Sequence, residues 1–161
     1  MSHEQRVREL GIDIPDYNVT PYPGSSIGTM KSHHITGNLL FLSGHIPVYP
    51  DGRSLHPGIV GKNVTLEQGY AAARLTGIHV VAGIKFALGD LDRVVSIINT
   101  LNFVVCTPEF TDVPLVSNGC ADLLVEVFGR DAGLGARATI GVNSLHDGVC
   151  FETWVTVEIR A

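Results

Sequence analysis

Two charged residues near the C-terminus stand in apolar sequence, where a charge is unusual. Arg137 interrupts the run 135–140 and Glu152 interrupts the run 150–155. The planar fork of an arginine can hold a carboxylate through two hydrogen bonds. A carboxylate that loses contact with water has a raised pKa, as a general acid or base requires. The two residues therefore predict a site that binds a small carboxylated ligand at Arg137 and handles a proton at Glu152.

The end of the chain determines where these residues lie. The sequence predicts strands over 136–145 and 149–160, joined by a hairpin at 147–148, because Asp-Gly is the strongest short hairpin signal. In that register Arg137 lies opposite Glu158. An ion pair between these two residues is thus the structural alternative to ligand binding.

Alternation along the last strand separates two faces. The odd-numbered positions from 149 are mostly apolar and should face the helices, whereas Glu152 faces away and could simply be an exposed strand charge. The register pairs Glu152 with Asn143 and puts Arg137 on the same helix-free face, about 20 Å away at ~3.3 Å per residue. If both residues serve one site, we expect them to come from different subunits, or a bulge to shorten the gap.

Local signals predict the elements that precede this hairpin. Residues 31–47 are rich in β-formers and predict a hairpin. A capping box at Thr65 and Gln68 predicts a helix over 65–89, a β-branched stretch predicts a strand over 92–105, and a second helix should span 112–129. The first helix has a small face that could approach a sheet closely, formed by Gly69, Gly77, Gly83 and several alanines.

The resulting order is strand, strand, helix, strand, helix, strand, strand. It predicts the α+β class, a single domain with a mixed β-sheet and two helices packed on one face. Residues 1–30 contain several prolines and should form an irregular N-terminal extension, whereas residues 31–161 should form the domain.

Composition bounds the kind of protein. The chain has 161 residues, of which 45% are hydrophobic and 17% charged, with a net charge of −5. Soluble domains carry about 25% charged residues. The low charge therefore predicts that part of the apolar surface is buried against a partner. No run reaches the roughly 18 consecutive apolar residues of a membrane span, and no secretory signal is visible. We therefore expect a cytoplasmic homo-oligomer without a membrane partner, its interface on the helix-free face with Cys150, Trp154 and Thr156.

Other site types are disfavoured. The acidic balance has no cluster of Lys and Arg to neutralise a phosphate backbone, so nucleic acid is not the expected partner. The three cysteines are widely spaced, without a C-x-x-C pair, and should be packed core thiols. His33 and His34 are adjacent on a strand and point to opposite faces, which argues against a shared metal.

Several ordered motifs resemble those of one family. Arg137, Ile140, Val142 and Leu145 fit R-x-x-V-x-V-x-x-L, Glu152 follows Arg137 by 15 positions, and FLSGHIP at 41–47 resembles F-x-SGQ-I-P. GDLDRVV after the first helix and LLVEVFG near the end of the second complete the set. Together they resemble the Rid (YjgF/L-PSP endoribonuclease-like) family of reactive-intermediate deaminases over residues 31–160. The resemblance implies a chorismate-mutase-like fold, a homotrimer, and ligand sites in the clefts between subunits.

The resemblance also implies an activity. It is the hydrolysis of an imine or enamine, such as 2-aminoacrylate, to a 2-keto acid and ammonia, with no metal or cofactor. Arg137 would hold the substrate carboxylate and Glu152 would orient the attacking water. Further binding residues would be Ser43, Gly44, Thr139, Asn118 and Met30. The expected partner is therefore a small carboxylated imine, enamine or keto acid.

Some positions depart from the family pattern. Met30 stands where the family has a pocket tyrosine, and Tyr22 lies too far upstream to replace it without a shift of the chain. Thr139 replaces a cysteine, His45 a glutamine and His146 a proline. These departures bear on the identity of the substrate.

Two other functions remain open from the sequence. The same cleft could belong to a non-catalytic binder of small carboxylated metabolites. An endoribonuclease is the third alternative, which the acidic charge opposes.

Overall fold

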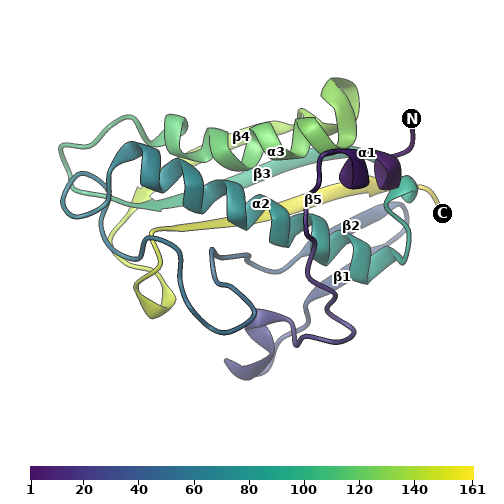
Figure 1. The fold of residues 1–161 in the computed structure, drawn as a ribbon, viewed down its shortest axis with the longest axis horizontal. Helices are drawn as coiled ribbons and strands as arrows, with labels where there is room; N and C mark the ends of the chain where they lie inside the picture. The colour runs from purple at the N-terminus through teal and green to yellow at the C-terminus, as the bar shows by residue number, and fades with distance from the viewer.

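The strand at the centre of the sheet is the last one in the chain. The computed structural model describes all residues 1–161, and its five strands lie in the order β1-β2-β5-β3-β4 (Figure 1). This is a mixed α+β fold, as predicted. The strands are β1 (His33–Thr36), β2 (Leu39–Leu42), β3 (Val94–Val105), β4 (Ala136–Val142) and β5 (Phe151–Ile159).

Two long helices run side by side across one face of this sheet (Figure 1). Helix α2 (Leu66–Leu88) begins at the predicted capping box of Thr65 and Gln68, and it ends at Gly89 with φ 74°. Helix α3 (Val113–Gly133) has its predicted break at Gly129, where φ is 81°, and continues for one more turn. Both helix predictions are confirmed, because caps and glycine stops are local signals.

Helix α2 forms the centre of the core. By length and composition it could cross a membrane, although the sequence offered no uninterrupted apolar run of that length. However, 61% of its apolar window is buried inside the protein. Its apolar side chains pack against the sheet and α3, as those of a core helix do.

The predicted hairpin at the end of the chain is wrong. Strand β4 pairs in parallel with β3, and β5 pairs antiparallel with β3, so β3 separates the two strands that we expected to pair. Residues 146–148 form a short 3-10 turn in the connection that passes from one side of β3 to the other. The Asp-Gly signal therefore marks a turn, but not a two-residue hairpin.

The corrected register moves Arg137 to the other face of the sheet. Arg137 pairs with Thr100, which pairs with the core residue Val155, so the Arg137 side chain faces the helices. Glu152 pairs with Phe103 rather than Asn143 and faces away from the helices. The predictions that Arg137 lies opposite Glu158 and shares a face with Glu152 are both wrong.

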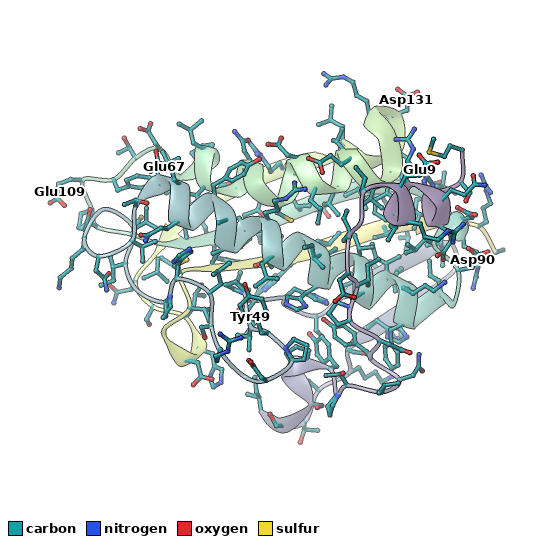
Figure 2. All side chains as sticks on the ribbon, viewed as in Figure 1. Glu9, Tyr49, Glu67, Asp90, Glu109 and Asp131 are labelled. Carbon is teal, nitrogen blue, oxygen red and sulfur yellow. The ribbon has the colours of Figure 1, made fainter.

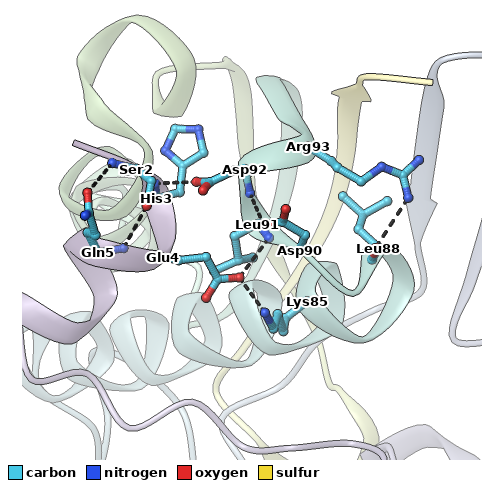
Figure 3. A network of polar contacts seen from close by, with 10 residues as sticks. All are labelled: Ser2, His3, Glu4, Gln5, Lys85, Leu88, Asp90, Leu91, Asp92 and Arg93. Carbon is cyan, nitrogen blue, oxygen red and sulfur yellow. Dashed lines mark hydrogen bonds and ion pairs between the residues drawn. The ribbon is translucent and has the colours of Figure 1, made fainter.

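The N-terminal extension is more ordered than predicted. Residues His3–Glu9 form helix α1, which begins at a capping box of Ser2 and Gln5. Figure 3 shows how α1 is attached to the far end of α2: Glu4 forms an ion pair with Lys85 and accepts a hydrogen bond from the Leu91 amide. Further along the chain, Pro23–Ser26 form a 3-10 turn, η1. The extension is thus held against the domain at a fixed place.

The helix-free face of the sheet is apolar and exposed. Three of its large side chains, Trp154, Ile140 and Phe41, are 50%, 46% and 43% exposed. Acidic residues such as Glu67, Glu109 and Asp131 lie instead around the margin of the molecule (Figure 2). Cys150, expected on this face, lies just before β5 and is instead fully buried in the core. All three cysteines are free thiols in or against the core, as predicted.

Candidate functional site

A β-bulge after β2 shapes the first part of the site. Between the pairs Phe41–Thr156 and His45–Thr153, the chain advances four residues on one strand and three on the other. The extra residue bends the strand and re-aims its backbone, as bulges do beside functional sites. Gly44 lies in this bulge, beside Glu152 of β5.

The Glu152 carboxylate contacts the bulge closely. A Cβ added to Gly44 would lie 2.7 Å from Glu152 Oε2 and 3.2 Å from Trp154 Nε1. A side chain at position 44 would therefore displace this carboxylate. Trp154 Nε1 donates a hydrogen bond of 2.6 Å to Glu152 Oε2, and no Lys, Arg or His forms an ion pair with Glu152. The carboxylate is half-buried and held in place without a cation.

Tyr22 completes this side of the site, although it lies well upstream of the position expected for a pocket tyrosine. Its hydroxyl donates a hydrogen bond of 2.8 Å to the carbonyl of Gly44. Burial, and second the nearby Glu152 carboxylate, raise the pKa of Tyr22 to about 12, so the phenol stays neutral. The η1 turn folds the chain back after Tyr22, and both Tyr22 and Met30 reach the same cavity.

These residues surround a cavity of about 570 Å³, which we call the Glu152 cavity. It extends from the helix-free face past the bulge to His79 of α2 and to His45, which packs against α2. Its walls come from the N-terminal extension, the bulge and the middle of the sheet. The lining includes Tyr22, Gly24, Ile27, Met30, Phe41, Ser43, Gly44, His45, His79, Leu101, Glu152 and Trp154.

Two buried histidines lie at the inner end of the Glu152 cavity. His45 and His79 are each 2% exposed. His45 Nδ1 donates to the Ser43 carbonyl at 2.8 Å, which leaves Nε2 unprotonated and packed against Gly83 of α2. The Tyr17 hydroxyl lies 3.2 Å from His79 Nδ1. Burial lowers the pKa of each imidazole to about 4, so both are neutral at physiological pH.

We expect this burial to make the fold sensitive to mild acid. An unfolded histidine titrates near 6.5 but these two titrate near 4 when folded, so the unfolded state binds more protons as pH falls below 6.5. The free energy of unfolding has its full value above pH 6.5 and falls as the pH drops from 6.5 to 4. At pH 5 each histidine has reduced it by about 2 kcal/mol. Urea unfolding at pH 7.5 and 5.0 measures the loss.

The matched variants separate buried from exposed histidines. His45→Gln should roughly halve the loss of stability between the two pH values, whereas His34→Gln, at an exposed position, should leave it unchanged. An equal loss in wild type and His45→Gln would show that His45 does not carry this pH dependence.

Arg137 lies in a separate hollow on the helix side of the sheet. It is exposed on β4, which is an edge strand, and its Nη1 donates a 2.7 Å hydrogen bond to Asn118 Oδ1 of α3. No carboxylate forms an ion pair with it, so the expected alternative, a pair with Glu158, is excluded. The hollow, the Arg137 groove, has a volume of about 500 Å³. The guanidinium keeps donors free for an anionic ligand.

Thr139 accompanies Arg137 rather than Glu152. It lies two residues further along β4, and its hydroxyl lies 2.7 Å from Ser117 Oγ and 3.4 Å from Asn102 Nδ2. The side chain is therefore engaged within the protein, toward α3. It is not a free hydrogen-bonding group for a ligand, and it does not line the groove that contains Arg137.

The predicted site residues thus divide into two groups. The first contains Met30, Ser43, Gly44 and Glu152, and the second contains Asn118, Arg137 and Thr139. Ser43 also has its hydroxyl occupied, because it donates to the carbonyl of Lys31. The two groups lie on opposite faces of the sheet of one chain, and no single hollow holds both charges.

Comparison with known proteins places the chain among similar folds. Residues 4–150 match the model of a family described as YjgF/chorismate mutase-like, putative endoribonuclease. A Trypanosoma cruzi protein, Protein TCP17, is 38% identical over 154 residues, which are 96% of this chain and 92% of that protein.

Two solved structures share the whole fold. The protein Atu1372 from Agrobacterium tumefaciens is 33% identical, with a TM-score of 0.85, over 98% of this chain and 94% of that one. A putative endoribonuclease from Shewanella oneidensis MR-1 is 26% identical, with a TM-score of 0.89, over 99% of this chain and 100% of that one. The similarity includes the N-terminal extension, because nearly the full length of each chain is covered.

Proposed function

Since the chain belongs to the YjgF/chorismate mutase-like family, in which the Rid proteins are grouped, we propose that it is an imine and enamine deaminase. It hydrolyses intermediates of the 2-aminoacrylate type to 2-keto acids and ammonia. The reaction takes place in clefts between the subunits of a homotrimer, where the Arg137 groove of one subunit meets the Glu152 cavity of the next.

One observation carries this proposal: two side chains of opposite charge, Arg137 and Glu152, form no ion pair within the chain. Arg137 has no carboxylate and Glu152 has no cation, although each is fixed by one neutral hydrogen bond, to Asn118 and Trp154 respectively. Isolated charges of this kind favour an external partner of opposite charge or a proton. A carboxylated imine supplies the first to Arg137, and its hydrolysis gives Glu152 a proton to handle.

The positions of the two charges support a site shared between subunits. Arg137 lies on the edge strand β4, where a neighbouring chain can approach. The exposed apolar face with Phe41, Ile140 and Trp154 offers the surface that such a neighbour would bury. Within one chain the sheet separates the two charges, so association of subunits is the way to join them.

The chemistry needs few groups. Arg137 holds the ligand carboxylate bidentately, which fixes the adjacent imine carbon. Glu152 accepts a proton from a water molecule as the water oxygen forms a bond to that carbon. Transfer of that proton to the imine nitrogen gives a carbinolamine. The proton of its hydroxyl then moves to the amino group, again through Glu152, and the carbon–oxygen double bond forms as the carbon–nitrogen bond breaks, releasing ammonia and the 2-keto acid. Neutral Tyr22 holds the Gly44 carbonyl and thereby the bulge beside Glu152.

The experiment is to generate 2-aminoacrylate from serine with a dehydratase and to measure ammonia and pyruvate released with and without this protein. We expect faster release with wild type, and release at the background rate with Arg137→Ala. Equal rates for wild type and the variant would contradict the proposal. Ligand binding that depends on Arg137, without turnover of any imine, would instead identify a binder of carboxylated metabolites.

Gly44 provides a finer test of the Glu152 side. The Cβ of Gly44→Ala would lie 2.7 Å from Glu152 Oε2 and must displace the carboxylate. Because a misplacement of about 1 Å can cost a hundredfold in rate, we expect kcat to fall by tenfold or more, with little change in KM. Gly69→Ala is the matched control, since its added Cβ would meet only the side chains of Val116 and Val60, away from Glu152. Similar kcat values for the two variants would show that Gly44 does not position Glu152.

A further inference from the structure

We propose, on the premise of the deaminase reaction above, that this site prefers intermediates with a bulky apolar side chain over the three-carbon 2-aminoacrylate. The branched aliphatic and aromatic 2-imino acids form this substrate class. The size and the lining of the Glu152 cavity carry the inference.

The cavity is much larger than the reacting atoms require. Its volume of about 570 Å³ lies within the ~300–1,000 Å³ of pockets that enclose drug-sized ligands. A three-carbon ligand held beside Glu152 would leave most of that space to water. A longer apolar side chain can occupy it, because the cavity continues past the carboxylate toward His45 and toward His79 of α2.

The lining around the mouth is apolar. Ile27, Met30 and Trp154 are 50%, 45% and 50% exposed, and all three line the cavity. Covering such side chains with an apolar ligand group is favourable in proportion to the area removed from water. Glu152 and the neutral phenol of Tyr22 place polar atoms where the imine would react. The inner end has two further polar side chains, His45 and His79, which are both buried and neutral.

The N-terminal extension builds the wall opposite the sheet. A Cβ added to Gly24 would lie 2.6 Å from the Tyr22 ring and 3.1 Å from Met30 Sδ and Cε, so these three residues pack as one surface. The unbranched thioether of Met30 can adapt to ligands of different shape. This wall belongs to the same chain as Glu152.

The test compares small and bulky ligands in wild type and in one variant of this wall. Binding of pyruvate and of 4-methyl-2-oxopentanoate is measured by calorimetry, and turnover is measured with 2-aminoacrylate and with the leucine-derived imine from an amino acid oxidase. We expect the bulky ligand to bind at least about tenfold more tightly and its imine to have the higher kcat/KM. Met30→Trp should reduce the difference to about twofold by filling the cavity.

Val19→Trp is the control, because Val19 is 81% exposed in the same extension and lines none of the cavities described. It should keep the wild-type preference. Equal binding of both ligands by wild type, or an equal effect of Met30→Trp on both, would overturn the inference even if turnover is observed. Selective binding without turnover would uphold the substrate class and refute the deaminase reaction. If neither ligand binds, both proposals fail.

Discussion

Subunits with Arg137→Ala and subunits with Glu152→Gln, each inactive alone, are expected to regain about a quarter of the wild-type activity when refolded together at equal ratio. In the proposed trimer each site would take Arg137 from one subunit and Glu152 from the next. Random assembly then gives both native residues to one site in four. Each variant alone should be slower by a hundredfold or more, since it lacks either the group that holds the ligand or the base that activates the attacking water.

Two controls make the mixing experiment decisive. The double variant Arg137→Ala/Glu152→Gln, refolded with either single variant, should regain nothing, because no site can then contain both native residues. Size-exclusion chromatography with light scattering should give the mass of a trimer for every mixture. Full assembly without regained activity would show that Arg137 and Glu152 do not act in one shared site.

The division between local and long-range signals explains which parts of the fold were predictable. The capping box at Thr65 and the glycine stop at Gly89 act within a few residues, so the limits of α2 follow from the sequence. The pairing of β4 does not, because it depends on β3, which precedes it by a whole helix. A strand–helix–strand unit usually pairs its strands in parallel. That rule, applied to 94–142, would have outweighed the Asp-Gly signal.

The site was predictable in its residue types but not in its geometry. Arg137 and Glu152 stand out as charges in apolar strands, and that contrast needs no knowledge of pairing. The face of the sheet on which each residue lies depends on how the strands pair. The wrong prediction that β4 pairs with β5 therefore placed both residues on the same face. Tyr22 was set aside by counting along the chain, whereas the η1 turn after it brings it to Gly44. The prolines on either side of Tyr22 were the available signal, since they restrict the backbone there.

The second large effect expected is on stability, at the contact between the two long helices. We predict that Gly119→Ala destabilises the fold by about 3 kcal/mol or more. Its Cβ would lie 2.1 Å from the backbone oxygen of Tyr70 and 2.9 Å from the backbone nitrogen of Arg74. Backbone atoms of a buried helix cannot move aside singly, so α2 and α3 must separate. Thermal unfolding at fixed protein concentration should show a Tm lower by about 10 °C.

Gly69→Ala is the matched variant in the same contact. Its Cβ would approach only side-chain atoms of Val116 and Val60, at 3.2–3.4 Å, and alanine favours a helix by about 1 kcal/mol over glycine. Its Tm should therefore stay close to that of wild type. Equal Tm values for the two variants would refute the close helix contact. Gly69 and Gly77 thus allow α2 to approach α3, rather than the sheet as the sequence predicted. Gly83 instead leaves room for the His45 ring.

The helix contact also bears on the site, because Gly119 follows Asn118, which holds Arg137. If α3 moves away from α2, Asn118 moves with it and the guanidinium loses its neutral anchor. Gly119→Ala should therefore raise KM for the carboxylated substrate even at temperatures well below its Tm, whereas Gly69→Ala should not. An unchanged KM in folded Gly119→Ala would mean that the α3 wall of the Arg137 groove is positioned independently of this contact.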